Sequence, residues 1–141
     1  MIGYLLDTNV ISETTRPKPD EDVTRWLARL PVLLLPSIGV YELASGIWRL
    51  PEGKRRVFLE NWLSELLSSN CQVLSFDRDA ALGCAKLESE TRRRGRTIEQ
   101  RDLYILATAK AQDLGVATRN LAHFRGFGVP VYDPFSDVHS F

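Results

Sequence analysis

Residues 3–9, Gly-Tyr-Leu-Leu-Asp-Thr-Asn, join a short apolar run to an acid and two further polar residues. An apolar run of this length that ends at polar residues is typical of a buried strand. Further runs predict four more strands of the same kind. The full predicted set is Gly3–Leu6, Val32–Leu35, Gln72–Phe76, Gly115–Thr118 and Val129–Tyr132.

Longer segments with helical periodicity lie between these strands. Apolar residues at i, i+3, i+4 and i+7 predict an amphipathic helix over residues 20–30. Further helices are predicted over residues 37–50, 51–69, 77–94 and 99–114, with Ser37, Pro51 and Asp77 at their starts and Gly95 and Gly115 as stops. Strands that alternate with helices predict an α/β fold, in which helices cover both faces of a mainly parallel sheet of about five strands.

Length and composition place the chain among ordinary globular proteins. Its 141 residues, 44% of them hydrophobic, fit one domain over residues 1–141. The 18 basic and 18 acidic residues cancel, which argues against a protein that coats nucleic acid without selectivity. Two cysteines are too few for a disulfide framework. The start lacks the basic segment of a signal peptide, and no apolar run could span a membrane, so we expect a cytoplasmic protein.

Polar residues follow the predicted strands at the edge where α/β sheets place their sites. Asp7 ends the first strand, and Thr118, Arg119 and Asn120 end the fourth. The second strand leads through Ser37 toward Glu42. Asp7, taken alone, is equally well explained as a helix N-cap, because Asp is favoured there.

Two more acids fall within predicted helices. Asp102 shares the face of its helix with Ile105, Leu106 and Ala109, and a carboxylate on an apolar face is costly unless it is paired or bound to a metal. The alternative is a first-turn acid that the helix N-terminus stabilises. The periodicity around Glu42 instead favours a surface position, because the apolar stripe of that helix points away from it.

Acids from separate segments favour a hard cation. Mg²⁺ and Mn²⁺ prefer oxygen ligands and keep several waters, so Asp7, Glu42 and Asp102 could suffice as ligands. Four polar residues could orient ligands or waters around them, and three basic residues could hold substrate phosphates. The first group is Thr8, Asn9, Thr118 and Asn120, for which helix caps and turns are alternative roles; the second is Arg16, Lys18 and Arg119.

Other conspicuous residues have plainer explanations. His123 and His139 do not form a zinc site, and His139 lies in a tail that we expect to fray. The basic run of residues 92–96 lies near a helix end, where cations suit the helix dipole. Trp26, Trp48 and Trp62 occupy amphipathic patterns and are predicted to belong to the core.

Taken in order, these motifs resemble those of the PIN-domain ribonucleases, and among them the VapC- and FitB-type toxins. The resemblance rests on residues 5–13 (LLDTNVISE), 40–46 (VYELASG), 102–109 (DLYILATA), 117–124 (ATRNLAHF) and 129–135 (VPVYDPF). No single motif is specific, but the ordered set spans nearly the whole chain. The resemblance implies that Asp7, Glu42 and Asp102 are catalytic metal ligands. It matters most for Glu42, whose periodicity alone favoured a surface position.

The resemblance implies a PIN-like three-layer α/β/α sandwich and a metal-dependent endoribonuclease. Single-stranded or structured RNA would be cleaved by metal-activated water, with Mg²⁺ or Mn²⁺ held by Asp7, Glu42 and Asp102. It further implies a homodimer and the toxin of a toxin–antitoxin pair, with a cognate antitoxin that blocks the site. Operator DNA would be bound only through that antitoxin.

Two departures from the family pattern leave alternatives open. An acid is frequent in the family at the position of Asn120, and an Asp is frequent where His123 stands. These changes allow a PIN-like interaction module without activity. Phosphoryl transfer on Asp7 is a third hypothesis, but the second Asp of the phosphatase pattern is replaced by Asn9, and the Lys of a receiver domain is absent.

Overall fold

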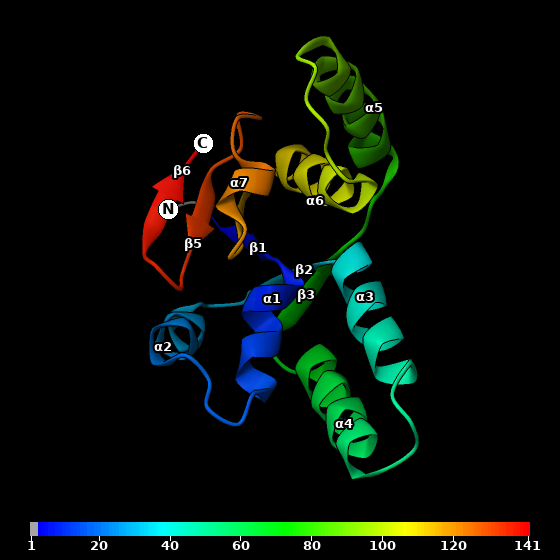
Figure 1. Ribbon diagram of the computed structural model, residues 1–141, viewed down its shortest axis with the longest axis vertical. Coiled ribbons are helices and arrows are strands. Elements are labelled where there is room, and N and C mark those ends of the chain that lie inside the picture. The colour runs from blue at the N-terminus through cyan, green and yellow to red at the C-terminus, as the bar shows by residue number, and fades with distance from the viewer. Residues whose placement is uncertain (1–2) are drawn as a thin grey trace.

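The computed structural model describes residues 3–141, and its centre is one six-stranded sheet (Figure 1). The strand order is β3-β2-β1-β4-β5-β6, and all neighbours are parallel except β5 and β6. The strands are β1 (Tyr4–Leu6), β2 (Leu33–Pro36), β3 (Cys71–Leu74), β4 (Gly115–Ala117), β5 (Val131–Asp133) and β6 (Val138–Ser140). The mainly parallel sheet was therefore predicted correctly, but it has six strands. The predicted domain includes residues 1 and 2, which lie outside the described part.

Helices cover both faces of the sheet (Figure 1). Leu5 belongs to the core cluster formed with α5, α6 and α7, whereas Leu6 belongs to the cluster formed with α1, α2 and α4. Adjacent strand residues point to opposite faces, so β1 contributes to both halves of the core. The helices are α1 (Thr8–Ile11), α2 (Glu21–Arg29), α3 (Ser37–Trp48), α4 (Lys54–Ser68), α5 (Arg78–Arg93), α6 (Gln100–Ala111) and α7 (Leu121–Phe124), and a 3₁₀ turn covers Ser12–Thr15.

Several helix boundaries differ from the predicted ones. Pro51 does not open α4, which begins at Lys54 after Gly53, and Ser37 is the first residue of α3 instead of its cap. Asp77 caps α5 as predicted, and Gly95 follows that helix with φ of 65°. Short elements such as α1, α7 and β6 were not predicted, because three or four residues carry too little periodicity to detect.

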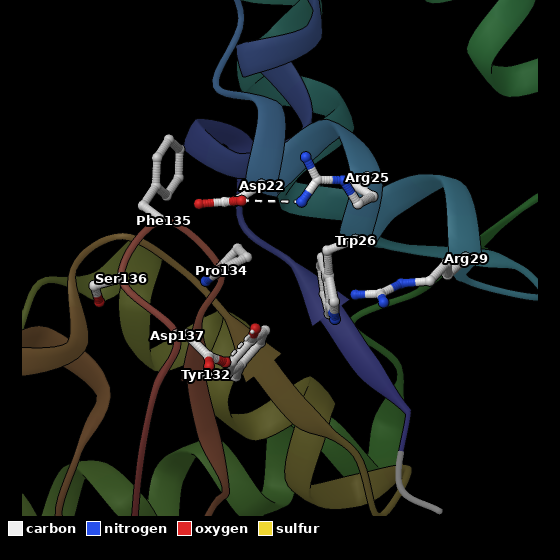
Figure 2. Close-up of a pocket in the computed structure, with 9 residues that line it drawn as sticks. All are labelled: Asp22, Arg25, Trp26, Arg29, Tyr132, Pro134, Phe135, Ser136 and Asp137. Atoms are coloured by element: carbon white, nitrogen blue, oxygen red, sulfur yellow. Dashed lines mark hydrogen bonds and ion pairs between the residues drawn. The ribbon is translucent and has the colours of Figure 1, made fainter.

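The sheet edge beyond β5 closes with a hairpin that the sequence did not predict. His139 lies in β6, not in a frayed tail, and its ring stacks on Tyr132 with centroids 4.4 Å apart. A pocket of about 320 Å³ lies between this hairpin and α2 (Figure 2). Its lining includes Trp26, Arg29 and Tyr132, and the Tyr132 hydroxyl donates a hydrogen bond of 2.9 Å to Asp137. Among the described helices, none is long and apolar enough to cross a membrane.

Two of the three tryptophans pack as predicted. Trp26 and Trp62 pack against the core on the face of α2 and α4, but Trp48 is 69% exposed, contrary to the prediction. The guanidinium of Arg56 lies 4.4 Å from the centre of the Trp48 ring, so this exposed side chain contacts a cation instead of the core.

Gly115 is the first residue of β4, in agreement with the fourth predicted strand, but the helix that it was also predicted to stop ends before it. The helix ends at Ala111, and Asp113 takes the left-handed conformation with φ of 55°. A Cβ on Gly115 would lie 2.6 Å from the Tyr4 ring and 2.7 Å from the carbonyl oxygen of Pro130. Gly115 is therefore required by the close approach of two neighbouring strands.

We predict that Gly115→Ala destabilises the protein by about 1–3 kcal/mol, because the Pro130 carbonyl belongs to the adjacent backbone and cannot move aside easily. Gly83 is the matched control, since it lies inside α5 with open space around its Cβ position. Gly83→Ala should stabilise by about 0.5–1 kcal/mol through helix propensity. Urea unfolding of both variants measures the difference, and equal effects would contradict this account of Gly115.

A second prediction concerns alkaline pH. Burial, together with the hydrogen bond to Asp137 and the charge of that residue, raises the pKa of Tyr132 from 10.0 to about 12. The unfolded chain then loses this proton at lower pH than the folded one, so stability present below pH 10 is lost as the pH rises from 10 toward 12. In Tyr132→Phe the free energy of unfolding should fall less steeply over this range. Equal slopes in the two proteins would contradict the assignment.

Candidate metal centre

The site lies where the strand order reverses, beside β1 at the centre of the sheet. β1 is flanked by β2 and β4, and the chain residues that follow β1 and β4 are Asp7 and Thr118. Both side chains are fully buried. In open α/β sheets this point, outside the carboxyl ends of the strands, is where ligands bind.

Asp7 is fixed by hydrogen bonds to both of its carboxylate oxygens. Oδ1 accepts from the Thr8 amide at 2.8 Å, so Asp7 caps α1. Oδ2 accepts from the Thr118 hydroxyl at 2.8 Å and from the Asn9 side chain at 3.4 Å. The cap role that the sequence offered for Asp7 is therefore confirmed, and the same carboxylate also bonds to Thr118 after β4.

Three carboxylates from three elements converge on a single guanidinium. Asp7 follows β1, Glu42 lies on α3 and Asp102 lies in the first turn of α6. Arg101 donates from Nε to Glu42, from Nη2 to Asp7, and from Nη1 to Asp102 at 2.8 Å. We call these three acids the acidic centre.

Burial and charge act in opposite directions within the acidic centre. Burial raises the pKa of Asp102 above its ordinary value, although the hydrogen bond and the charge of Arg101 lower it in part. For Arg101, burial lowers the pKa, but hydrogen bonds and charge attraction from Glu42 and Asp7 outweigh it and raise the pKa above its ordinary value. Three carboxylates around one guanidinium leave the centre with two formal negative charges.

The donor set suits a hard divalent cation. All three acids offer oxygen ligands, and Glu42 has a buried Oε1 without a hydrogen-bond partner. No group of three acidic, histidine or cysteine side chains within residues 3–141 is arranged to hold a metal ion as it stands. Arg101 occupies the space among the acids, so the ligands fit the cation in chemistry but are arranged around a guanidinium.

The remaining predicted residues divide between neighbours of the centre and separate surfaces. Asn9 accepts from the Arg119 amide at 3.2 Å, and Thr118 Oγ1 accepts from the Asn120 amide at 3.0 Å. The Thr8 hydroxyl accepts from Arg101 at 3.3 Å. Thus Thr8, Asn9 and Thr118 contact Asp7 or its partner, whereas Asn120 supports Thr118 through its backbone.

The predicted phosphate-binding residues are less closely tied to the centre. The guanidinium of Arg119 lies 4.4 Å from the centre of the Phe135 ring. Arg16 pairs with Glu13 at 3.4 Å, and Lys18 lines a separate surface pocket next to α2. Among the interactions of residues 3–141, no hydrogen bond or ion pair joins Arg16 or Lys18 to the acidic centre.

Two pockets are each lined in part by an acid of the acidic centre. One, of about 280 Å³, is lined by residues that include Glu99, Asp102 and His123. The other, of about 270 Å³, is lined by residues that include Thr8 and Glu42. His123 also approaches Asp102, with Nδ1 and Oδ2 3.4 Å apart. Asp102 and Glu42 therefore each line a pocket, whereas Asp7, which is fully buried, lines neither of these two.

Two residues of the basic run at the end of α5 make contacts within the protein. Arg92 pairs with Glu88 at 2.9 Å. Arg96 donates to the carbonyls of Arg125 and Ala122 at 2.7 and 3.0 Å and lies over the Phe127 ring. The Arg96 contacts join the segment after α5 to α7 and to the residues that follow it.

Arg101 was missed in the sequence. The available signal was a cation in the first turn of a helix, where it opposes the helix dipole. A cation in that position is unfavourable unless opposite charges lie nearby, but this signal does not say which acids those are.

Comparisons with known proteins agree with this fold. The PIN domain family model matches residues 4–126, and the chain belongs to this family. The VapC ribonuclease Y4jK of Sinorhizobium fredii is 38% identical over 93% of this chain and 96% of its own length. The toxin FitB of Neisseria gonorrhoeae is 39% identical over 94% of this chain and 99% of its own length. The structure of FitAB bound to an IR36 DNA fragment superposes with a TM-score of 0.84 at 36% identity, covering 94% of this chain and 95% of that one.

A third prediction tests the support of Asp7. Thr118→Val should destabilise the protein by about 1–3 kcal/mol, because a buried carboxylate oxygen and the Asn120 amide both lose the hydroxyl. Thr24→Val is the control, since its hydroxyl contacts only the Asp20 carbonyl on an exposed face of α2. That variant should change stability by no more than about 0.5 kcal/mol in urea unfolding. A Thr118→Val effect as small as the control would show that the hydroxyl does not support Asp7.

Proposed function

We propose that residues 1–141 form one PIN domain that acts as a metal-dependent endoribonuclease. The observation that carries the proposal is the convergence of Asp7, Glu42 and Asp102 at the carboxyl edge of the sheet. The VapC relative is named a ribonuclease, which supports RNA as the substrate. The substrate would be single-stranded or structured RNA.

Asp7, Glu42 and Asp102 would hold Mg²⁺ or Mn²⁺. When bound, such an ion supplies Lewis-acid stabilisation of charge on a phosphate and lowers the pKa of water. Thr118 and Asn9 keep Asp7 oriented through its Oδ2. His123 lies beside Asp102. Asn120 carries no charge, so the proposed ligands are the three carboxylates alone.

The basic residues near the centre would hold the RNA backbone. Arg119 follows β4 at the same sheet edge as Asp7, which makes it the best placed of the three candidates. Arg16 and Lys18 follow the short turn after α1 and would contact phosphates farther along the strand. Phosphate contacts of this kind position a nucleic acid without reading its sequence.

We further propose that the protein is the toxin of a toxin–antitoxin pair and acts in the cytoplasm as a homodimer. The toxin FitB relative and the FitAB complex with DNA support this assignment. A cognate antitoxin would cover the acidic centre, and operator DNA would be bound only through that partner. The two free cysteines, Cys71 and Cys84, are compatible with a reducing compartment.

An interaction module without activity is the second candidate. Arg101 within the acidic centre and the neutral Asn120 both favour it, because a guanidinium already pairs with all three carboxylates. Such a module would bind its partner without needing a divalent cation.

The fourth prediction separates these two functions. Partner-free protein is incubated with a mixed set of structured and single-stranded RNAs in Mg²⁺, Mn²⁺ or EDTA, and the products are mapped at nucleotide resolution. We expect cuts with metal and none with EDTA. Asp7→Asn and Asp102→Asn should each lower the cleavage rate by at least about 100-fold. Changing a residue that only orients a metal ligand lowers activity by about 10–100-fold, and the loss of a ligand itself should cost more.

Asp113→Asn is the control for this experiment. It makes the same chemical change, and Asn tolerates the left-handed conformation of residue 113 at the opposite end of the sheet. Its rate should equal that of the unmodified protein. Retained cleavage in both Asp7→Asn and Asp102→Asn would overturn the assigned centre, and the absence of both metal binding and cleavage would favour the interaction module.

A further inference from the structure

Arg101 places a cation within the acidic centre, where the proposed function requires a metal ion. We propose that the Arg101 guanidinium and a divalent metal ion compete for Asp7, Glu42 and Asp102, so that metal binding requires this side chain to leave. The inference rests on the proposed function, because it takes the acidic centre to be a metal site. It assigns Arg101 as a residue that sets the metal affinity of the centre.

The contacts make the two cations mutually exclusive. Each of the three guanidinium nitrogens of Arg101 donates to a different acid. The acids therefore surround the guanidinium, and a metal ion that bound all three would have to occupy the same space. Like charges would also repel strongly at such close range in a buried site.

The charges favour displacement by a divalent ion at sufficient concentration. Arg101 offsets one of three negative charges, whereas a divalent cation would offset two. The unpartnered Oε1 of Glu42 shows that the guanidinium does not satisfy every oxygen of the centre. The apparent metal affinity is then the intrinsic affinity multiplied by the fraction of molecules in which Arg101 has left.

Arg101 has a path out of the centre. Its side chain is 26% exposed, whereas those of Asp7 and Asp102 are 0% and 3% exposed. The residue lies in the first turn of α6, at the edge of the centre. A long side chain in this position can turn toward solvent while the backbone stays in place. The helix dipole does not hold it there, because a cation at a helix N-terminus is unfavourable.

The test is Mn²⁺ binding by isothermal titration calorimetry, with RNA absent. Arg101→Met removes the charge and keeps an aliphatic stem, and we expect it to bind Mn²⁺ at least about 10-fold more tightly than the unmodified protein. Arg78→Met is the matched control, because it removes the same charge from a side chain that is 89% exposed and contacts only Asp79. Its Mn²⁺ affinity should match that of the unmodified protein.

A chemical competitor provides an independent readout. Methylguanidinium carries the same group as Arg101, so millimolar concentrations should weaken Mn²⁺ binding to Arg101→Met. The same additive should have a much smaller effect on the unmodified protein, whose own guanidinium already occupies the centre. Equal weakening in the two proteins would overturn the competition.

The outcomes distinguish this inference from the proposed function. Equally tight Mn²⁺ binding by the unmodified protein and Arg101→Met would overturn the competition and leave the metal site standing. No binding by either would overturn both. If Arg101→Met is unfolded without metal, circular dichroism should show that Mn²⁺ restores its fold. Failure to do so, with Arg101→Lys folded and binding Mn²⁺ as the unmodified protein does, would overturn the inference.

Discussion

The structure depends on the burial of like charges at one point of the sheet. Asp7 is fully buried, Asp102 nearly so, and both face the same small volume as Glu42. Buried carboxylates are tolerated only where hydrogen bonds and an opposite charge offset the loss of water. The hydrogen bonds come from the Thr118 hydroxyl and the Thr8 amide, and the opposite charge comes from Arg101. Thr118 follows β4, Thr8 begins α1 and Arg101 lies in α6. The acidic centre therefore joins the elements that surround it, and a change at any one of them alters the environment of the others.

Much of the fold could be predicted, because buried parallel strands and amphipathic helices leave strong patterns. Five of the six strands and the five long helices were located, although their ends differ by a few residues. Some helix ends were predicted wrongly because more than one nearby residue can begin a helix. Pro51 is favoured as a first residue, yet α4 begins at Lys54, directly after Gly53. The hairpin of β5 and β6 depends on contacts such as the stacking of Tyr132 on His139, and sequence periodicity does not record these.

The acidic centre was less predictable than the fold. Asp7 and Asp102 could be recognised as candidates from their positions. An acid directly after a buried strand, or on the apolar face of a helix, is costly unless it is paired or bound to a metal. Glu42 carries none of its own, since its helix periodicity places it toward solvent, and only the resemblance to a family identified it. Arg101 lies 59 residues from Glu42 and 94 from Asp7 along the chain. No local pattern could show that these side chains meet, because the sheet topology alone brings them together.

The position of β1 also has a consequence for the order of events during synthesis. β1 is synthesised well before its partner β4, and the Asp7 carboxylate bonds to Thr118, 111 residues later. Contacts this distant in sequence form late, because loop closure must precede them. A nascent chain that ends before residue 115 has neither Thr118 nor the strand that pairs with β1 on that side. The buried Asp7 carboxylate therefore gains its Thr118 partner only after β4 has been synthesised.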